Sequence, residues 1–315
     1  MKIGMVGSGL VGSTAAYAMV MQGIGRELIL VDIDQERSRA EASDILHAVP
    51  FAHPLKVRSD GYTDLKGSEV VVVTAGANQE PGESRLDLLE RNAEIFEGII
   101  PKIVQNTPEA ILIVVTNPVD IMTHLTANIA SNYDIPSNRI LGSGTMLDTA
   151  RFRALVGECV GVDALHVHAY VIGEHGDSEV LTWSLVRIGA VPLDTFCELR
   201  DLEIDEEVCA DIDQRVRAAA YEIIEGKGAT YYGIGSALAQ LTEVILHNQR
   251  RILTVCTPEG NVAGLSNVTL SLPRLIGGDG VITTFPIPMN DAEKKAFKES
   301  AHVINDSIES LQKPG

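Results

Sequence analysis

Residues 2–13 read KIGMVGSGLVGS, a short apolar run that passes into three glycines and then into a helical pattern. Gly7, Gly9 and Gly12 form the pattern GxGxxG, in which glycines allow a tight turn, a close approach of backbone to ligand and a close helix–strand contact. The helix that follows would offer free N–H groups to a pyrophosphate. The stretch therefore predicts the strand, turn and helix that open a dinucleotide-binding fold.

Asp32 supports this interpretation, because it ends the second expected strand, twenty residues after Gly12. A carboxylate at this place accepts hydrogen bonds from the ribose diol of adenosine and repels a 2′-phosphate, which favours NAD over NADP. The alternative is a glycine-rich turn in an α/β protein that binds no dinucleotide. The combination of the turn with Asp32 argues against that alternative.

The composition sets limits on the class of protein. The chain has 315 residues, of which 45% are hydrophobic, so it can bury a sizeable core in one large or two closely joined domains. A net charge of −18 argues against nucleic acid or an anionic membrane as a partner, and no signal peptide or membrane span is visible. Zinc or CxxC spacing is absent among Cys159, Cys197, Cys209 and Cys256, so we expect buried free thiols and a location in the reducing cytoplasm.

The first half of the chain alternates short β-branched runs with helical stretches, which predicts a doubly wound parallel sheet. The expected strands are 2–6, 27–31, 69–74 and 110–116, and the expected helices are 10–22, 35–48 and 86–106.

The second half has a different, mixed α+β pattern. We expect helices at 147–157, 205–225 and 291–311, a strand at 165–172 and a ladder of strands over 252–281. We place the domain boundary near residues 142–144, which gives a dinucleotide-binding domain over 1–143 and a substrate domain over 144–315. No Pro/Gly/Ser linker separates them, so they should share a large interface with a cleft.

The polar stretch TAGANQEPGESRLDLLERN, residues 74–92, follows a hydrophobic run and leads into a charged helix. Loops of this length without structure of their own are usually lids or binding loops. Gln79 and Arg85 are therefore expected to touch whatever the protein binds.

Three further residues have the chemistry of an active site. Asp148 and Arg151 stand at i and i+3 in TMLDTARFR, so both project from one face of the expected helix. His175 lies in IGEHGDSE, at a strand end before a glycine, where an imidazole can be exposed. A single histidine is more often structural, and the spacing by itself leaves a structural and a catalytic role equally open.

Together these motifs resemble the lactate/malate dehydrogenase family, in particular its bacterial L-lactate dehydrogenases. The match covers essentially the whole chain and follows the family's order: GSGLVGS, TAGANQEPGESR, TNPVD, GTMLDTARFR, GEHGDSE and KGATYYG. The resemblance implies an N-terminal Rossmann domain and reversible, NADH-dependent reduction of pyruvate to L-lactate.

The resemblance also implies a role for individual residues. His175 would be the proton donor and acceptor, Asp148 its partner, and Arg85 the group that polarises the reacting carbonyl. Arg151 would bind the substrate carboxylate, and Asn117 and Thr230 would complete the pocket. Besides the glycines and Asp32, the residues expected to border NAD are Val11, Arg37, Tyr62, Gly76, Ala77, Val115, Asn117 and Ser143.

The chemistry of the reaction agrees with these roles. Delivery of hydride to the carbonyl carbon of pyruvate builds negative charge on the carbonyl oxygen, which needs a proton donor and a fixed cation. Imidazolium has suitable acidity near neutral pH, and arginine supplies charge without titrating. Because nicotinamide performs the redox step, no metal is required.

Gln79 bears on the choice of substrate, because it lies at the position that faces the substrate side chain in this family. Malate dehydrogenases place an arginine there, and uncharged Gln79 would leave the second carboxylate of oxaloacetate without a partner. Malate dehydrogenase is therefore the disfavoured alternative. A non-catalytic NAD-binding protein is a second alternative. Such a protein could have lost Arg85, Asp148, Arg151 or His175 without harm, so the presence of all four argues against it.

Arg153 needs a separate explanation, since two positions after Arg151 on a helix it points about 200° away. In family members that fructose 1,6-bisphosphate activates, an arginine and a histidine at the positions of Arg153 and His168 bind phosphate at a subunit interface. The alternative is an exposed arginine and a structural histidine. The resemblance further implies a homo-oligomer, as a tetramer or a dimer in equilibrium with one.

Overall fold

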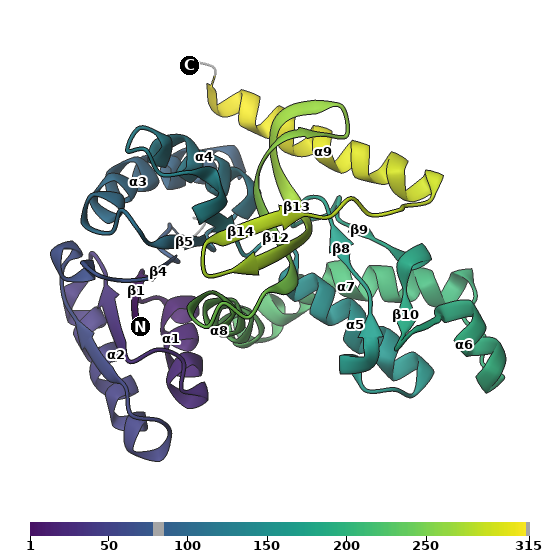
Figure 1. Ribbon diagram of the computed structural model, residues 1–315, viewed down its shortest axis with the longest axis horizontal. Helices are drawn as coiled ribbons and strands as arrows, with labels where there is room; N and C mark the ends of the chain where they lie inside the picture. Colours follow the sequence, from purple (N-terminus) through teal and green to yellow (C-terminus); the bar gives the residue numbers. More distant parts are fainter. Residues whose placement is uncertain (78–84, 313–315) are drawn as a thin grey trace.

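A computed structural model describes residues 1–77 and 85–312 and shows a parallel sheet with helices on both faces at the N-terminal end of the chain (Figure 1). The expected first elements are confirmed residue by residue as β1 (Lys2–Val6), α1 (Leu10–Gln22), β2 (Glu27–Val31) and α2 (Gln35–Ala48). The expected N-terminal Rossmann sheet is thereby confirmed in its opening unit, a strand that enters a helix through a glycine turn.

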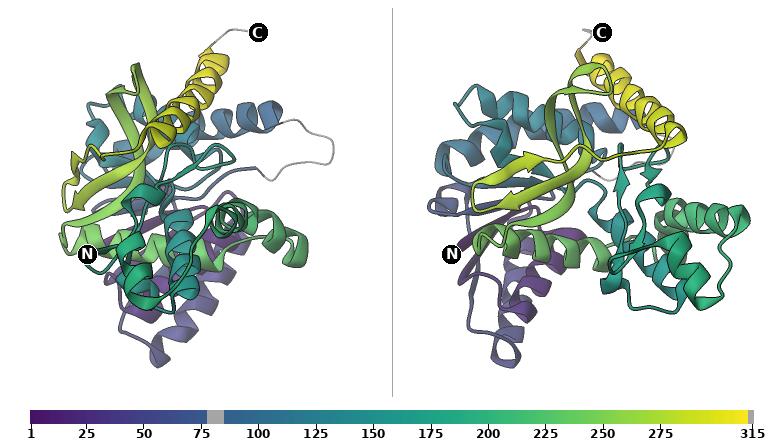
Figure 2. Two further views of the ribbon diagram at one scale, coloured as in Figure 1. Left: turned by 90° about the vertical axis from the view of Figure 1, so that its right-hand side faces the viewer. Right: turned by 45° about the vertical axis from the view of Figure 1, so that its right-hand side comes forward.

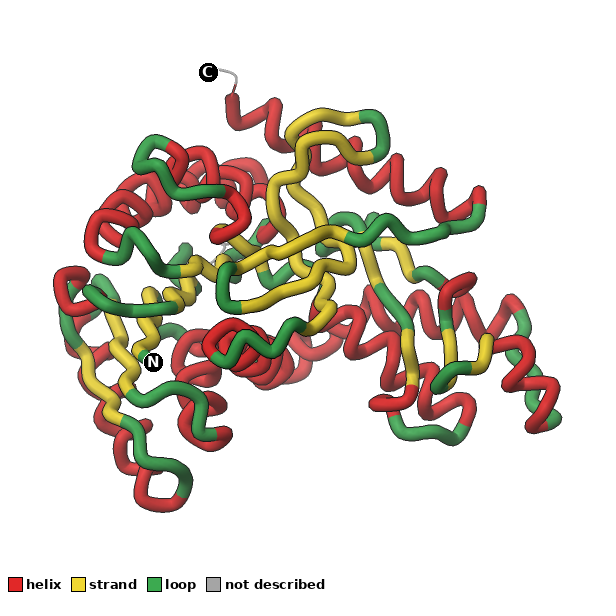
Figure 3. Tube along the Cα trace, in the orientation of Figure 1, coloured by secondary structure: helices red, strands yellow, loops and turns green. Residues whose placement is uncertain are grey.

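One nine-stranded sheet runs through both halves of the chain, in the order β14-β13-β12-β6-β5-β4-β1-β2-β3. The strands from β3 (Lys56–Ser59) through β4 (Val70–Val73) and β5 (Ile111–Val114) to β6 (Ile140–Gly142) are parallel. The tube in Figure 3 shows the later strands continuing the same sheet. The expected doubly wound parallel sheet is therefore correct, and the C-terminal strands extend it.

The extension consists of the expected ladder, now resolved into β12 (Arg251–Val262), β13 (Leu265–Gly277) and β14 (Gly280–Thr284). These three strands pair antiparallel with one another. Strand β12 joins the parallel part antiparallel to β6, where Cys256 lies opposite Gly142.

The faces of the parallel sheet are covered by two different sets of helices, as the apolar strands require. Val71 and Val73 of β4 belong to one core with α3 (Arg85–Asn106) and α4 (Val119–Ser131). Their neighbours Val70 and Val72 point the other way, into a second core with α1, α2 and α8 (Tyr232–Leu246). Because side chains alternate along a strand, a fully buried strand must be apolar on both faces. Each fully buried side chain of this size contributes about 1.5–3 kcal/mol.

A third core lies under helices α5 (Met146–Val160), α6 (Leu193–Arg200) and α7 (Glu206–Lys227). Helices α5 and α7 were expected, whereas α4, α6 and α8 were not. The C-terminal helix α9 (Asp291–Gln312) was also expected, and it packs against β13 and α4, as two further views show (Figure 2). Among the described residues, none of the helices combines the length and apolarity needed to cross a bilayer.

The expected single strand at 165–172 is wrong. A 3₁₀ turn (Ala164–His166) is followed by β7 (Val167–His168) and then by β8 (Val171–Ile172). Strand β7 pairs with β10 (Arg187–Ile188), which also pairs with β11 (Val191–Pro192), whereas β8 pairs with β9 (Val180–Leu181). The run is interrupted because its two halves find partners in different sheets.

Candidate active site

The candidate site follows the carboxyl ends of the parallel strands, where open α/β sheets bind ligands. The glycine turn follows β1, Asp32 follows β2, and Thr116 and Asn117 follow β5. Strand β1 lies between β2 and β4, so the chain reverses its direction of winding beside the glycine turn. This reversal creates the crevice in which a dinucleotide can lie.

The glycine turn is closed on its inner side and open on its outer side. Gly7 has a φ of 103°, in the region that favours glycine. A Cβ on Gly12 would lie 2.0 Å from the carbonyl oxygen of Gly7, whereas a Cβ on Gly9 would meet nothing within 4 Å. Helix α1 starts at Leu10 without a side-chain cap, so its first N–H groups have no capping side chain. These features fit a pyrophosphate at the helix N-terminus.

Asp32 is tied to this turn. Its Oδ2 accepts hydrogen bonds from the Ser8 N–H at 2.5 Å and the Ser8 hydroxyl at 3.0 Å, and its Oδ1 accepts one from the Asp34 N–H. Burial, together with the charge of Asp32, raises the pKa of Tyr62. Asp32 is therefore near enough to Tyr62 for its charge to act on the Tyr62 hydroxyl.

Two of the loops at this edge are bonded through Asn92 of α3. Its Oδ1 accepts a hydrogen bond from the Ala77 N–H at 2.8 Å, and its Nδ2 donates to the carbonyl of Asn117 at 3.2 Å. Gly76 packs closely against Thr116, where an added Cβ would lie 2.5 Å from Cγ2. The expected residues Gly76, Ala77 and Asn117 are thus brought together.

The other residues expected near NAD lie on the elements around this edge. Val11 is half-buried in the first turn of α1, and Val115 is half-buried directly after β5. Ser143 is buried after β6, where its N–H donates to the carbonyl of Val114. Arg37 is exposed on α2 and forms an ion pair with Glu41 one turn later.

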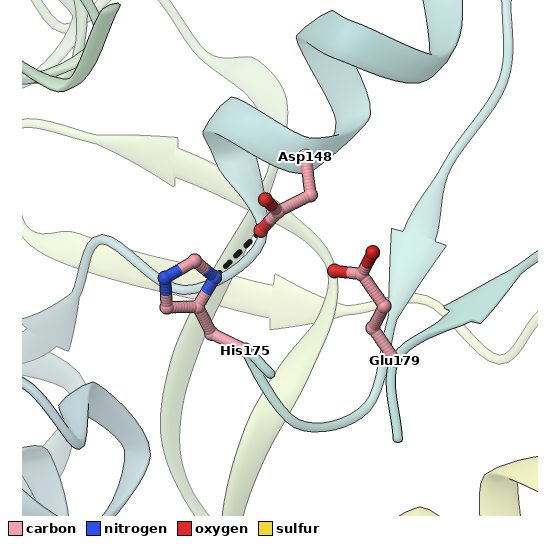
Figure 4. A group of neighbouring side chains, drawn as sticks. All are labelled: Asp148, His175 and Glu179. Carbon is pink, nitrogen blue, oxygen red and sulfur yellow. Dashed lines mark hydrogen bonds and ion pairs between the residues drawn. The ribbon is translucent and has the colours of Figure 1, made fainter. Parts of the chain in front are cut away.

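The catalytic candidates meet at the start of α5 (Figure 4). Asp148 Oδ2 lies 2.6 Å from His175 Nδ1, and Asp148 Oδ1 accepts a hydrogen bond from Arg151 Nη1 at 2.9 Å. The Asp148 side chain is 3% exposed, whereas 26% of the His175 side chain can be reached by solvent. The imidazole is therefore held at Nδ1 from the protein side, which leaves Nε2 for a ligand.

The electrostatics favour a charged pair. Burial acts to lower the pKa of His175, but the charge of Asp148 and the hydrogen bond to it raise that pKa to about 9. Burial acts to raise the pKa of Asp148, but the charge and hydrogen bond of His175 and the charge of Arg151 hold it below its usual value. At neutral pH the site thus holds an imidazolium on a carboxylate.

The backbone of His175 is fixed by residues from distant parts of the chain. Gly173 exchanges two backbone hydrogen bonds with Ser271 of β13, each of 2.9 Å. The His175 N–H donates to Oδ2 of Asp120 at 2.8 Å. Asp120 is buried, and burial raises its pKa to about 6 against the hydrogen bond and the charge of His175. Sequence reasoning missed Asp120 although it lies in TNPVD, because only the fold brings α4 to His175.

Gln79 lies outside the described residues, and Arg85 is the first residue of α3. Thr230 is half-buried beside α8. It lines a hollow of about 470 Å³ together with Lys227, Tyr231 and Tyr232. The ammonium group of Lys227 lies 3.4 Å from the ring centre of Tyr231.

The two expected effector residues lie on α5 and on β7. Arg153 Nε donates to the carbonyl of Ala169 at 2.9 Å, and its guanidinium lies 5.3 Å from the ring centre of Tyr170. His168 is exposed on β7, opposite Arg187 of β10. Burial lowers the pKa of Arg153, Tyr170 acts to raise it, and the charge of Arg251 acts to lower it further.

Family models match both halves of the chain. A model described as lactate/malate dehydrogenase, NAD binding domain, matches residues 1–142. A second, described as lactate/malate dehydrogenase, alpha/beta C-terminal domain, matches residues 145–313.

Individual relatives are similar over the full chain. An L-lactate dehydrogenase of Geotalea daltonii is 56% identical over 311 residues, which is 99% of each chain. One of Thermus aquaticus is 50% identical over 311 residues, again 99% of each chain. Among solved structures, a lactate dehydrogenase from a Medee basin deep-sea metagenome library superposes with a TM-score of 0.95, at 38% identity and 99% coverage of both chains.

Proposed function

The chain belongs to the lactate/malate dehydrogenase family and has the activity of an NAD-dependent L-lactate dehydrogenase; we propose that His175, held by Asp148, donates the proton that completes the reduction of pyruvate. The observation that carries this assignment is the Asp148 carboxylate, which binds His175 with one oxygen and Arg151 with the other. A single buried carboxylate thereby orients both a proton donor and a carboxylate-binding cation.

The proton moves in one direction during reduction and returns during oxidation. His175 Nε2–H donates its proton to the carbonyl oxygen as hydride reaches the carbonyl carbon, and the imidazole becomes neutral. Its Nδ1–H stays on the ring and keeps donating to Asp148 Oδ2, which fixes the tautomer and keeps Nε2 free to take the proton back from L-lactate. When bound, the nicotinamide ring of NADH supplies the hydride.

Arg151 orients the substrate in this proposal. A guanidinium presents donors in a planar fork, and Asp148 occupies only Nη1, so further donors can bind the carboxylate of pyruvate side by side. Asn117 and Thr230 would border the same pocket, and Arg85 would polarise the carbonyl. A substrate held in this way presents its carbonyl to His175 in one orientation.

NAD would be held by the features at the carboxyl ends of the strands. The open turn at Gly9 accommodates the pyrophosphate, and Asp32 accepts hydrogen bonds from the adenosine ribose. All four cysteines are free, although Cys159 is exposed rather than buried as expected, and free thiols suit a protein that works in the reducing cytoplasm. We place the enzyme there.

Pyruvate reduction is tested by the loss of NADH absorbance after pyruvate is added, with the chirality of the product determined. We expect turnover to L-lactate, and a loss of about 10³-fold in kcat/KM for His175→Asn. Replacement of the exposed His47 of α2 is the matched control and should leave the rate unchanged. A wild-type protein that does not oxidise NADH with pyruvate would overturn the proposal.

Fructose 1,6-bisphosphate is the effector that we propose, and Arg153 and His168 would bind its phosphates between subunits of a homotetramer. In the part of the chain that the structure describes, no carboxylate pairs with Arg153, and Arg251 is near enough to lower its pKa. Like charges placed together in a chain of net charge −18 favour a bound anion.

The effector proposal is tested by pyruvate saturation with and without the bisphosphate, combined with the mass in solution. We expect a lower apparent KM and a tetramer in its presence, and both effects should be lost in Arg153→Gln. Arg215→Gln is the matched control, because Arg215 lies on the exposed side of α7 and pairs only with acidic side chains among the described residues. An unchanged KM and unchanged mass in the wild type would remove the proposal.

A further inference from the structure

Glu179 is a buried carboxyl group that the reaction as described above does not use. It precedes β9 and is 4% exposed. Its Oε1 has no hydrogen-bond partner among the residues that the structure describes. Its carboxyl group points toward Asp148, and the nearest side-chain oxygens and ring nitrogen of Asp148, His175 and Glu179 all lie within 4.8 Å of one another (Figure 4).

A buried carboxylate with a free oxygen needs a metal ion, a cation or a proton. The cluster has the ligand types of a metal site, but its other two members are already engaged. Asp148 accepts from His175 with one oxygen and from Arg151 with the other, and His175 Nδ1 bonds with Asp148. A metal ion would have to break both interactions, whereas a proton on Glu179 breaks neither.

The charged groups around Glu179 come from several elements. Asp148 and Arg151 act on it from α5, and Arg217 acts on it from α7. His175 acts on it from the loop that follows β8. The Arg217 Nη2 donates to the backbone carbonyl of Glu179 at 2.7 Å rather than to its carboxyl group.

Two further elements, α9 and α4, bring polar groups into this region, but these groups act on residues other than Glu179. Helix α9 packs against β9, but there its Ser300 bonds with Glu174 and its Glu293 bonds with Ser184. From α4, Asp120 acts on His175 rather than on Glu179.

The balance of these groups favours the protonated form at neutral pH. Burial and then the charge of Asp148 raise the pKa of Glu179 to about 8, against the charges of His175, Arg217 and Arg151. The charge of Glu179 is in turn one of those that raise the pKa of His175. Glu179 and His175 therefore lose their protons in neighbouring ranges of pH and influence one another.

We propose that Glu179 is a positioning residue for proton transfer, whose carboxyl group is neutral at neutral pH and becomes charged in alkaline solution, where its charge helps His175 to keep the catalytic proton. The inference rests on the proposed role of His175. Its consequence is a broadened pH range for pyruvate reduction. As the pH rises, Glu179 loses its proton before His175 does, and the new negative charge stabilises the imidazolium of His175.

The test is the ratio of kcat/KM for pyruvate at about pH 9 to that at about pH 7, since this ratio reports the protonation of His175 independently of the absolute rate. In Glu179→Gln the side chain keeps its shape but cannot become charged, so the imidazole should lose its proton at lower pH. We expect the alkaline inflection to move down by about half to one pH unit and the ratio to fall about 2- to 5-fold. Glu179→Asp, which keeps the charge, should restore part of the ratio.

Glu158→Gln is the matched control, because it removes the same charge from the exposed side of α5 and should leave the ratio unchanged. A Glu179→Gln ratio equal to that of the wild type, at any absolute rate, would overturn the inference while the proposed function stands. Failure of the wild type to reduce pyruvate would instead overturn the proposed function.

Infrared spectra of the wild type give a second test that does not depend on the folding of Glu179→Gln. The carbonyl band of a protonated buried carboxyl group should be present at about pH 7 and lost by about pH 9. The band should shift in Glu179→Asp, which assigns it. Absence of such a band in the wild type at about pH 7 contradicts the inference.

Discussion

Asp148 Oδ2 lies 2.6 Å from His175 Nδ1, although α5 and the loop after β8 are separate elements and Asp148 is almost fully buried. The same carboxylate binds Arg151 one helical turn later. A buried charge needs compensation, and here both cations that compensate it are groups proposed to act on the substrate. The stability of the site and its proposed chemistry therefore depend on one carboxylate.

Replacement of Asp148 by Asn tests this dependence. The substitution removes the charge that raises the pKa of His175 and allows the wrong tautomer, so the imidazole should be neutral at neutral pH. We expect kcat/KM for pyruvate to fall by about 10²-fold or more at neutral pH and to recover partly in acid. Steady-state rates from about pH 5 to about pH 9 measure this, with Asp44→Asn on the exposed side of α2 as the control. A pH profile that keeps its wild-type inflection would contradict the pairing.

Folding stability should depend on pH through His175. Its pKa rises from 6.5 to about 9 on folding, so its contribution is complete below about pH 6.5 and is lost as the pH rises through about 9. The difference in unfolding free energy between the wild type and His175→Asn should therefore be larger at about pH 6 than at about pH 10. Urea denaturation at both pH values measures it, and a difference that does not change with pH would refute the pairing in the folded state.

The glycine turn yields a prediction that separates folding from cofactor binding. An added methyl group at Gly9 meets open space, so Gly9→Ala should change the unfolding free energy by about 1 kcal/mol or less. The same methyl group would occupy the place proposed for the pyrophosphate, and we expect NADH affinity to fall about 10-fold or more. Fluorescence titration with NADH measures the affinity. Unchanged affinity would move the cofactor away from this turn.

Gly12 is the counterpart of Gly9 on the inner side of the turn. Its added methyl group would collide with the Gly7 carbonyl oxygen at 2.0 Å, so Gly12→Ala should reduce the yield of folded protein. A Gly12→Ala protein as stable as Gly9→Ala would show that the turn is less tightly packed than described.

Arg274 gives a prediction about stability that does not involve the active site. Its side chain is fully buried on β13 and donates to Glu259 of β12 and to Thr284 of β14. Glu259→Gln would leave a buried guanidinium without its carboxylate, at a cost of about 3 kcal/mol. Denaturant unfolding should show this loss, whereas kcat per folded molecule should remain that of the wild type. Unchanged stability would mean that the hydrogen bonds of Arg274 suffice without the charge of Glu259.

The N-terminal half of the fold could be predicted because its signals are local. Strands such as β4, apolar on both faces, and helices with clear starts, such as α2 after Asp34, show their periods in the sequence. Helix α4 was missed because it is buried over most of its surface, including Asp120 and His124, so it has no polar face to mark its period. The interruption between β7 and β8 depends on strand partners and leaves no local signal.

The candidate site likewise contains residues that local sequence motifs indicate and residues that only the fold brings into the site. Asp148, Arg151 and His175 belong to motifs, and the resemblance to a known family indicated their roles. Asp120 and Glu179 did not emerge, since a carboxylate becomes informative only when the fold buries it. Their burial results from α4 and β9 packing beside the loop of His175, which no spacing in the sequence reveals.

The choice between pyruvate and oxaloacetate tests the assigned activity of this chain most directly. Purified protein with saturating NADH should be given pyruvate and, separately, oxaloacetate, and kcat/KM should be compared. With an uncharged glutamine at position 79, we expect pyruvate to be preferred by about 10³-fold. An efficiency for oxaloacetate equal to or above that for pyruvate would contradict the assignment of this chain as an L-lactate dehydrogenase.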